Sequence, residues 1–135
     1  MSFMEWKEAY SVNVHEIDGE HKKLIGMIND LHAAMKVGKG KTIISGILRG
    51  MIDYATTHFG TEEKYMRVFD FPGYIEHKAE HDAFTDRVLD FQKKYNRGGV
   101  VLSFEVMDFL NNWLVMHIQG TDKKYSPFLN MKGLM

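Results

Sequence analysis

Apolar side chains recur along most of this chain at intervals of three and four residues, the spacing that places them on one face of an α-helix. Glycine and proline separate the stretches that follow this period. We therefore predict four long helices and a short tail helix, over residues 18–37, 42–69, 73–95, 103–120 and 122–129. Residues 1–17 lack the helical period, and Tyr10, Val12 and Val14 alternate as in an extended arm.

Several residues mark the expected ends of these elements. Asp18 and Ser103 are predicted N-caps of the first and fourth helices, because a short side chain with an oxygen accepts an amide hydrogen of the first turn. Pro127 is expected to limit the tail helix, since proline lacks the amide hydrogen. Trp6 is the expected anchor of the N-terminal arm.

The connections between the predicted helices are short, so neighbouring helices should run antiparallel. A length of 135 residues suffices for one domain with its own core. The sequence thus predicts an all-α protein, a single domain over residues 1–135. Its fold is an antiparallel up-down-up-down four-helix bundle with an N-terminal strap and a short C-terminal helix.

Polar residues interrupt the inward faces of all four long helices. A buried polar group without a partner costs about 1–3 kcal/mol, so these residues need partners. In an up-down-up-down bundle, the starts of the first and third helices lie at the same end as the ends of the second and fourth. That end receives His21, His58, Glu62, His77, His81 and His117.

Asp122 follows His117 by five residues, which is about 140° around an ideal helix. Its carboxylate reaches the same centre only if the backbone changes course. Gly120 lies where this change is expected, through either a helix end or a π-type insertion.

These side chains together indicate a metal site. A single inward histidine is usually a core residue with one hydrogen bond, but five histidines and two carboxylates at one height fit metal ions better. They exceed the needs of one ion, so we predict a dinuclear site in which both carboxylates bridge. His15 is expected in an exposed loop, and His32, about 16 Å further along the helix than His21, at the edge of the core.

Composition narrows the chemistry further. The chain has no cysteine, which excludes disulfides and thiolate metal sites. Its net charge of -1 lacks the basic excess of a nucleic-acid-binding surface. Neither a signal peptide nor an apolar run of about 20 residues is visible. We therefore expect a cytoplasmic protein that neither binds nucleic acid nor spans a membrane.

Four motifs occur together: Asp-Gly-Glu-His ending at His21, His58-x-x-x-Glu62, His77-x-x-x-His81 and His117-x-x-x-x-Asp122. In this combination the chain resembles the hemerythrins, most of all the single-domain bacterial hemerythrins, from Trp6 to Tyr125. The resemblance implies a non-haem centre of two iron ions (Fe2+/Fe3+) joined by an oxo or hydroxo bridge. By this resemblance one iron is held by His77, His81 and His117, the other by His21 and His58, and both by the bridging Glu62 and Asp122.

The resemblance also implies reversible O2 binding, for oxygen storage, delivery or scavenging, without catalytic residues. The iron held by two histidines keeps a position open for O2, or for small ligands such as NO and azide. The positions that match the O2 pocket of the family are apolar: Leu24, Phe59, Trp113, Leu114 and Ile118. Their alternative interpretation is plain core packing.

Other functions fit the same residues. The site could serve a di-iron enzyme, such as a peroxidase or an NO or O2 reductase, if electrons reach it. It could also serve an O2 or redox sensor module whose bound state changes the shape of the N-terminal arm, and less readily an iron store. The sequence identifies no protein partner.

Overall fold

The computed structural model describes residues 4–38, 41–97 and 104–135. The regular elements within these residues are all helical, and the long helices are α1 (His15–Lys36), α2 (Lys41–Val68), α3 (Tyr74–Asn96) and α4 (Phe104–Met116). A 3-10 turn, η1 (Glu8–Tyr10), lies in the arm before α1, and a π-helical turn, η2 (His117–Asp122), leads from α4 into α5 (Lys123–Met131).

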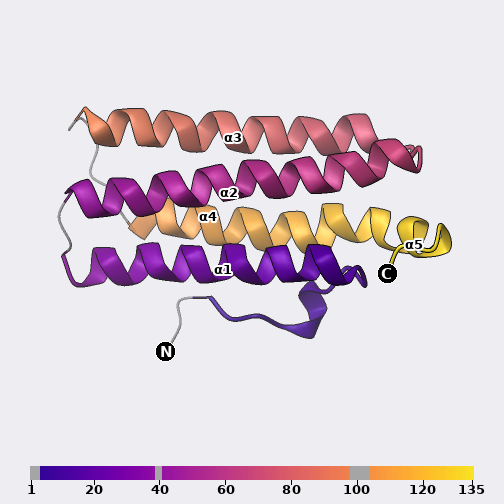
Figure 1. The fold of residues 1–135 in the computed structure, drawn as a ribbon. Coiled ribbons are helices and arrows are strands. Elements are labelled where there is room, and N and C mark those ends of the chain that lie inside the picture. Colours follow the sequence, from indigo (N-terminus) through magenta and orange to yellow (C-terminus); the bar gives the residue numbers. More distant parts are fainter. Residues whose placement is uncertain (1–3, 39–40, 98–103) are drawn as a thin grey trace.

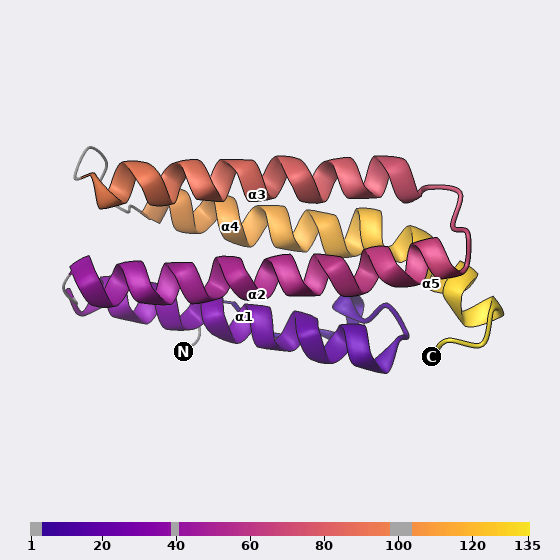
Figure 2. The same ribbon diagram turned by 45° about the horizontal axis from the view of Figure 1, so that its top comes forward.

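The four long helices lie side by side and alternate in direction (Figure 1). α3 and α4 form one side of the bundle, and α1 and α2 form the other (Figure 2). The ends of α2 and α4 therefore lie beside the starts of α1 and α3. This arrangement confirms the predicted all-α, up-down-up-down bundle with its strap and short C-terminal helix.

The inward apolar faces form the core that holds these helices together. Leu24, Ile28 and Leu31 of α1 are buried there, and each such side chain contributes about 1.5–3 kcal/mol on burial. Aromatic rings fill the space between α3 and α4, where Phe84 stacks on Trp113 with ring centroids 4.0 Å apart. The core thus fixes the height at which the polar residues of the four helices meet.

The first helix begins earlier than expected, and Asp18 is not its N-cap. α1 starts at His15, and the amide of Asp18 already donates a helical hydrogen bond to the carbonyl of Val14, at 2.9 Å. The Asp18 carboxylate instead turns back to the arm, where it accepts hydrogen bonds from Ser11 Oγ at 2.6 Å and the Val12 amide at 2.8 Å. The Asp18 side chain therefore holds the arm against α1 and does not cap the start of that helix.

The N-terminal arm runs along the bundle beside α1 (Figure 1). Tyr10, Val12 and Val14 are buried, as their alternation in the sequence suggests. Asn29 of α1 exchanges two hydrogen bonds with the backbone of Met4, both 2.8 Å long. Trp6 is half-buried against the core, so several residues share the anchoring that the sequence assigned to Trp6 alone.

The tail helix also differs from its prediction. Pro127 lies inside α5, which continues to Met131 and does not stop near Leu129. Pro127 is the fifth residue of α5, and its ring is exposed; it removes one backbone donor without ending the helix. The expected cap at Ser103 lies outside the described residues. Among the described helices, none is both long and apolar enough to cross a lipid bilayer.

Replacing Gly26 with alanine should stabilise the fold. Gly26 lies inside α1, and a Cβ added there meets no atom within 4 Å. We expect Gly26→Ala to raise the free energy of unfolding by about 0.5–1 kcal/mol in urea denaturation, because alanine loses less backbone entropy. Gly38, which follows α1 at a φ of 72°, is the control: Gly38→Ala should destabilise. A destabilised Gly26→Ala variant would contradict the open environment of this position.

Candidate metal centre

Seven buried polar side chains meet at the end of the bundle where α1 and α3 begin. They come from the start of α1, the end of α2, the start of α3 and the π-turn η2: His21, His58, Glu62, His77, His81, His117 and Asp122. None is more than 3% exposed. The structure therefore brings together all seven residues that the sequence proposed as ligands.

The seven residues form two groups that overlap at the carboxylates. One group contains three histidines, His77, His81 and His117, with Glu62 and Asp122; the other contains His21 and His58 with the same two carboxylates. Within each group the possible ligand atoms lie within 4.8 Å of one another. Two ions placed in these groups would share Glu62 and Asp122.

Asp122 faces both groups with different oxygens. Its Oδ1 lies 2.9 Å from His77 Nε2 and 3.0 Å from His117 Nε2, whereas its Oδ2 lies 3.1 Å from His21 Nε2. One oxygen toward each group is the orientation that a bridging carboxylate requires. The π-helical turn makes this possible, because its wider turn brings Asp122 around to the side of His117. Of the two changes of backbone course expected at Gly120, a helix end or a π-type insertion, the structure shows the π-type insertion.

Glu62 lies between the groups through one oxygen. Its Oε1 is 3.0 Å from His58 Nε2 and 3.4 Å from His81 Nε2. Its Oε2 accepts a hydrogen bond from the hydroxyl of Tyr125, a completely buried residue of α5. Tyr125 also stacks on the ring of His77, with centroids 5.4 Å apart. The phenol therefore fixes the rotation of the Glu62 carboxylate.

The chemistry of the donors fits metal cations. Six buried atoms at the centre make no hydrogen bond within the described part of the chain: Nδ1 and Nε2 of His21, Oε1 of Glu62, Nε2 of His77 and both carboxylate oxygens of Asp122. Several of these atoms are close together, yet they do not align as donor and acceptor. Each unsatisfied buried group costs about 1–3 kcal/mol. Cations in the shared space would satisfy these atoms together.

Three glutamates hold the outer nitrogens of the histidines, and the sequence analysis missed this role. Glu20 lies 2.7 Å from Nδ1 of His58, Glu63 lies 2.9 Å from Nδ1 of His81, and Glu80 lies 3.1 Å from Nδ1 of His117. Such contacts orient an imidazole and keep its hydrogen on the outer nitrogen, which leaves Nε2 free for a metal. Glu20 and Glu63 belong to the helix before that of their histidine, and Glu80 of α3 contacts the first residue of η2.

A local signal for these glutamates exists in the sequence. Glu20, Glu63 and Glu80 each stand next to a residue of the cluster on their own helix. Two threonines hold them in turn: Thr61 Oγ1 donates to Glu20 at 3.2 Å, and Thr121 Oγ1 donates to Glu80 at 2.8 Å. Each of these helices thereby carries a residue of the cluster and, next to it in the sequence, a glutamate that contacts a histidine of another element.

The buried charges influence one another strongly. Burial alone would lower the pKa of His58, but the charge of Glu62 and hydrogen bonds with Glu20 and Glu62 raise it to about 10. Burial alone would also lower the pKa of His117, but the charge of Asp122 and its hydrogen bond with the imidazole raise it to about 9. The same imidazoles hold the pKa of Glu62 and Asp122 below the usual range, despite burial. The carboxylates are therefore ionised and require positive charge beside them.

An apolar cavity of about 20 Å³ lies next to the cluster. Four of the five positions proposed for the O2 pocket line it: Leu24, Phe59, Trp113 and Leu114. Ile118 is buried but does not line the cavity. The remaining walls, which sequence reasoning did not assign, are Ile28, Met51, Ala55, Phe84 and Leu110. A periodic apolar sequence does not distinguish a cavity wall from ordinary core.

The other two histidines lie apart from the cluster. His15 is exposed, but it begins α1 instead of lying in a loop. His32 is half-buried in the later part of α1 and belongs to neither group of possible ligands. Neither residue was expected at the metal.

Fold and site together define a four-helix protein with a non-haem metal centre of imidazoles and carboxylates. The family model for the hemerythrin HHE cation-binding domain matches residues 12–129. The chain therefore belongs to the hemerythrin family, as its motifs suggested.

Known proteins resemble it over nearly their whole length. The bacteriohemerythrin of Methylococcus capsulatus is 35% identical over 131 residues, which cover 96% of this chain and 99% of that protein. The bacteriohemerythrin of Clostridium acetobutylicum is 31% identical over 127 residues, or 89% of this chain and 96% of that protein. The crystal structure of a wild-type hemerythrin matches with a TM-score of 0.90 and 35% identity, covering 95% of this chain and 98% of that one.

Removing one of the two shared carboxylates should remove metal. Glu62→Ala leaves the two groups of imidazoles with Asp122 as their only shared anion, so bound cations lose charge compensation. We expect this variant to retain less than about half of the wild-type metal after loading and desalting, measured by elemental analysis. His32→Ala is the control and should keep the wild-type metal content. Full loading of Glu62→Ala would contradict its place between two ions.

Metal binding should acidify the solution. His58 and His117, with pKa values of about 10 and about 9, carry protons at pH 7 in the metal-free protein, and a metal ion must displace them. Because raised pKa values favour protonation, metal binding should tighten as the pH rises from about 6 to 8. An indicator dye in weakly buffered solution should report roughly two protons released per chain on Co2+ addition. No release would show that these imidazoles are already neutral.

Proposed function

We propose that this protein binds O2 reversibly at a centre of two iron ions, for oxygen storage, delivery or scavenging. One observation carries the proposal: two groups of ligands share two buried carboxylates beside a small apolar cavity. Membership of the hemerythrin family supports the same conclusion. The cytoplasmic location expected from the sequence belongs to this proposal.

The two groups suggest different coordination. In the proposal, His77, His81 and His117 hold one iron, and His21 and His58 hold the other. Glu62 and Asp122 would hold both ions. Because one ion would have three imidazoles and the other only two, the second ion would keep room for a further ligand. The ion beside His21 and His58 is therefore the proposed binding place of O2, and of small ligands such as azide.

Iron is the metal that suits both the donors and the task. Imidazole binds zinc, copper, iron and nickel well, and bridging carboxylates favour hard ions, while the chain has no cysteine for softer ones. Bound iron supplies the open coordination position and the electrons that reversible O2 binding requires. Zinc fits the donors as well but has no accessible redox change.

The apolar cavity adjoins the histidines of the open position. Leu24 follows His21 by three residues, and Ala55 precedes His58 by three, so both lie one helical turn deeper on the faces that carry these histidines. Phe59 closes the cavity toward His81, on which it stacks at 3.9 Å between centroids. These walls exclude water and protons from the open position, which favours release of O2 over its loss in reduced form.

The polar residues around the cluster hold the imidazoles in place. Glu20 accepts the outer hydrogen of His58, and this contact orients Nε2 toward the centre. Tyr125 donates to Glu62 and keeps the other oxygen of that carboxylate directed at the histidines. Few groups at the centre need to reorient when O2 enters, which favours reversibility.

Optical spectra test the proposal. The iron-loaded, reduced protein should show a visible charge-transfer band when O2 is added and lose it when O2 is withdrawn, over repeated cycles. Protein loaded with zinc is the control and should show no band. Direct conversion to a stable oxidised form, or continued O2 consumption with a reductant, would contradict reversible binding and favour a di-iron enzyme.

A further inference from the structure

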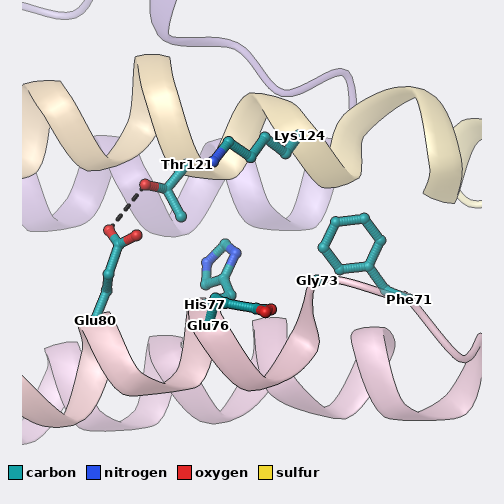
Figure 3. A pocket seen from close by; sticks show the side chains of 7 residues that line it. All are labelled: Phe71, Gly73, Glu76, His77, Glu80, Thr121 and Lys124. Carbon is teal, nitrogen blue, oxygen red and sulfur yellow. Dashed lines mark hydrogen bonds between the residues drawn. The ribbon is translucent and has the colours of Figure 1, made fainter.

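We infer that a polar cavity at the start of α3 is the port through which divalent metal ions reach the buried centre, with Glu76 attracting the ion and Lys124 opposing it. This inference rests on the metal centre of the proposed function, but not on its reaction with O2. The cavity has a volume of about 130 Å³ and opens between α3, η2 and α5 (Figure 3). Its lining is Phe71, Gly73, Glu76, His77, Glu80, Thr121 and Lys124.

A route is needed because the cluster is closed to solvent. Its seven side chains are at most 3% exposed, so a hydrated cation meets none of them at the surface. The apolar cavity of about 20 Å³ suits an ion poorly, because a cation there loses its water without gaining a ligand. The larger cavity offers carboxylate and hydroxyl oxygens that replace water step by step.

His77 forms the inner wall of the larger cavity. Figure 3 shows its ring behind Glu76 and facing the cavity. Its Nε2 lies 2.9 Å from Asp122 Oδ1, on the side of the metal centre. The imidazole of His77 therefore lies between the cavity and the other ligands, and an ion that reaches it has one residue left to pass.

The outer nitrogen of His77 lacks the carboxylate that three other histidines have. Glu20, Glu63 and Glu80 pair with His58, His81 and His117, but within the described residues no such partner faces Nδ1 of His77. An imidazole without this second contact turns more easily about its side-chain bonds. His21 also lacks such a partner, but of these two histidines only His77 lines the cavity, so His77 is the ligand placed to accept an ion from it and turn it inward.

The charges at the mouth have opposite effects on a cation. Glu76 is exposed, and no hydrogen bond or ion pair engages its carboxylate within the described part of the chain, so the charge is available to an approaching ion. Glu80 is occupied, since it accepts hydrogen bonds from Thr121 and from His117. The ammonium group of Lys124 lies on the opposite side of the mouth, beside Thr121, and repels cations there.

Loading kinetics test this port. Metal-free protein is mixed with excess Co2+ in a stopped-flow instrument, and the absorbance of protein-bound cobalt is followed; final stoichiometry is measured separately. We expect Glu76→Gln to slow loading about threefold and Lys124→Gln to speed it about twofold, with unchanged final stoichiometry. Added salt should reduce both differences, because it screens the mouth charges.

Asp86→Asn is the matched control. Asp86 is an exposed acid of the same helix, ten residues and about 15 Å beyond Glu76. Its loss lowers the overall charge equally and should leave the loading rate unchanged. Equal rates in all variants would overturn the port and indicate that ions enter when helices separate. Equal slowing by Glu76→Gln and Asp86→Asn would overturn it in favour of attraction by overall charge.

The outcomes separate this inference from the proposed function. A protein that binds no cobalt in any variant lacks the metal centre, and both proposals fail. Full loading at rates that neither Glu76→Gln nor Lys124→Gln changes overturns the port alone. Full loading with the expected rates but no reversible O2 spectrum overturns the O2 function alone.

Discussion

Two ionised carboxylates, Glu62 and Asp122, lie completely buried among five imidazoles, and their need for positive charge governs the rest of the site. Without metal, protons supply that charge, which is why the pKa values of His58 and His117 rise to about 10 and about 9. Two divalent cations supply it more completely and also satisfy the buried atoms that no hydrogen bond reaches. Protons and metal therefore compete for one set of nitrogens, so the folded protein is prepared for metal before it binds any.

The helices are tied together around these charges in chain order. Each of α1, α2 and α3 carries a glutamate whose carboxylate contacts a histidine later in the chain, in α2, α3 and η2 respectively. These contacts are possible because neighbouring helices run in opposite directions, so the starts of α1 and α3 lie at the same end of the bundle as the ends of α2 and α4 (Figure 1). η2 closes the sequence by turning Asp122 back toward His21 of α1, at 3.1 Å. A small shift of one helix would therefore disturb both an inward ligand and the outer partner of the next histidine.

Much of this arrangement is encoded in local sequence. Histidines at His21, His58, His77 and His117 fall on faces whose period is set by apolar neighbours, so their common height follows from the helix pattern and the topology alone. The partners of the outer nitrogens follow only in part. Glu63 and Glu80 each stand next to a residue of the cluster, but only the tertiary structure shows which histidine each one contacts. Asp18 has the residue type of an N-cap, yet its carboxylate finds Ser11 and Val12 in the arm. Long-range contacts of this kind overrule local preference.

The two cavities give the centre two unlike sides. On the side of Leu24 and Leu114 the walls are apolar and the space is small, so a neutral diatomic molecule passes where a hydrated ion does not. On the side of Glu76 and Thr121 the walls are polar and the space is larger, so ions and water pass more readily than they do through the core. His77 and the two rings that it contacts, those of His81 and His117, lie between the two cavities. A site that must take up metal from water and yet keep water from O2 requires this separation. The bundle provides it by placing the apolar cavity among its four long helices and the polar cavity at its end, between α3, η2 and α5.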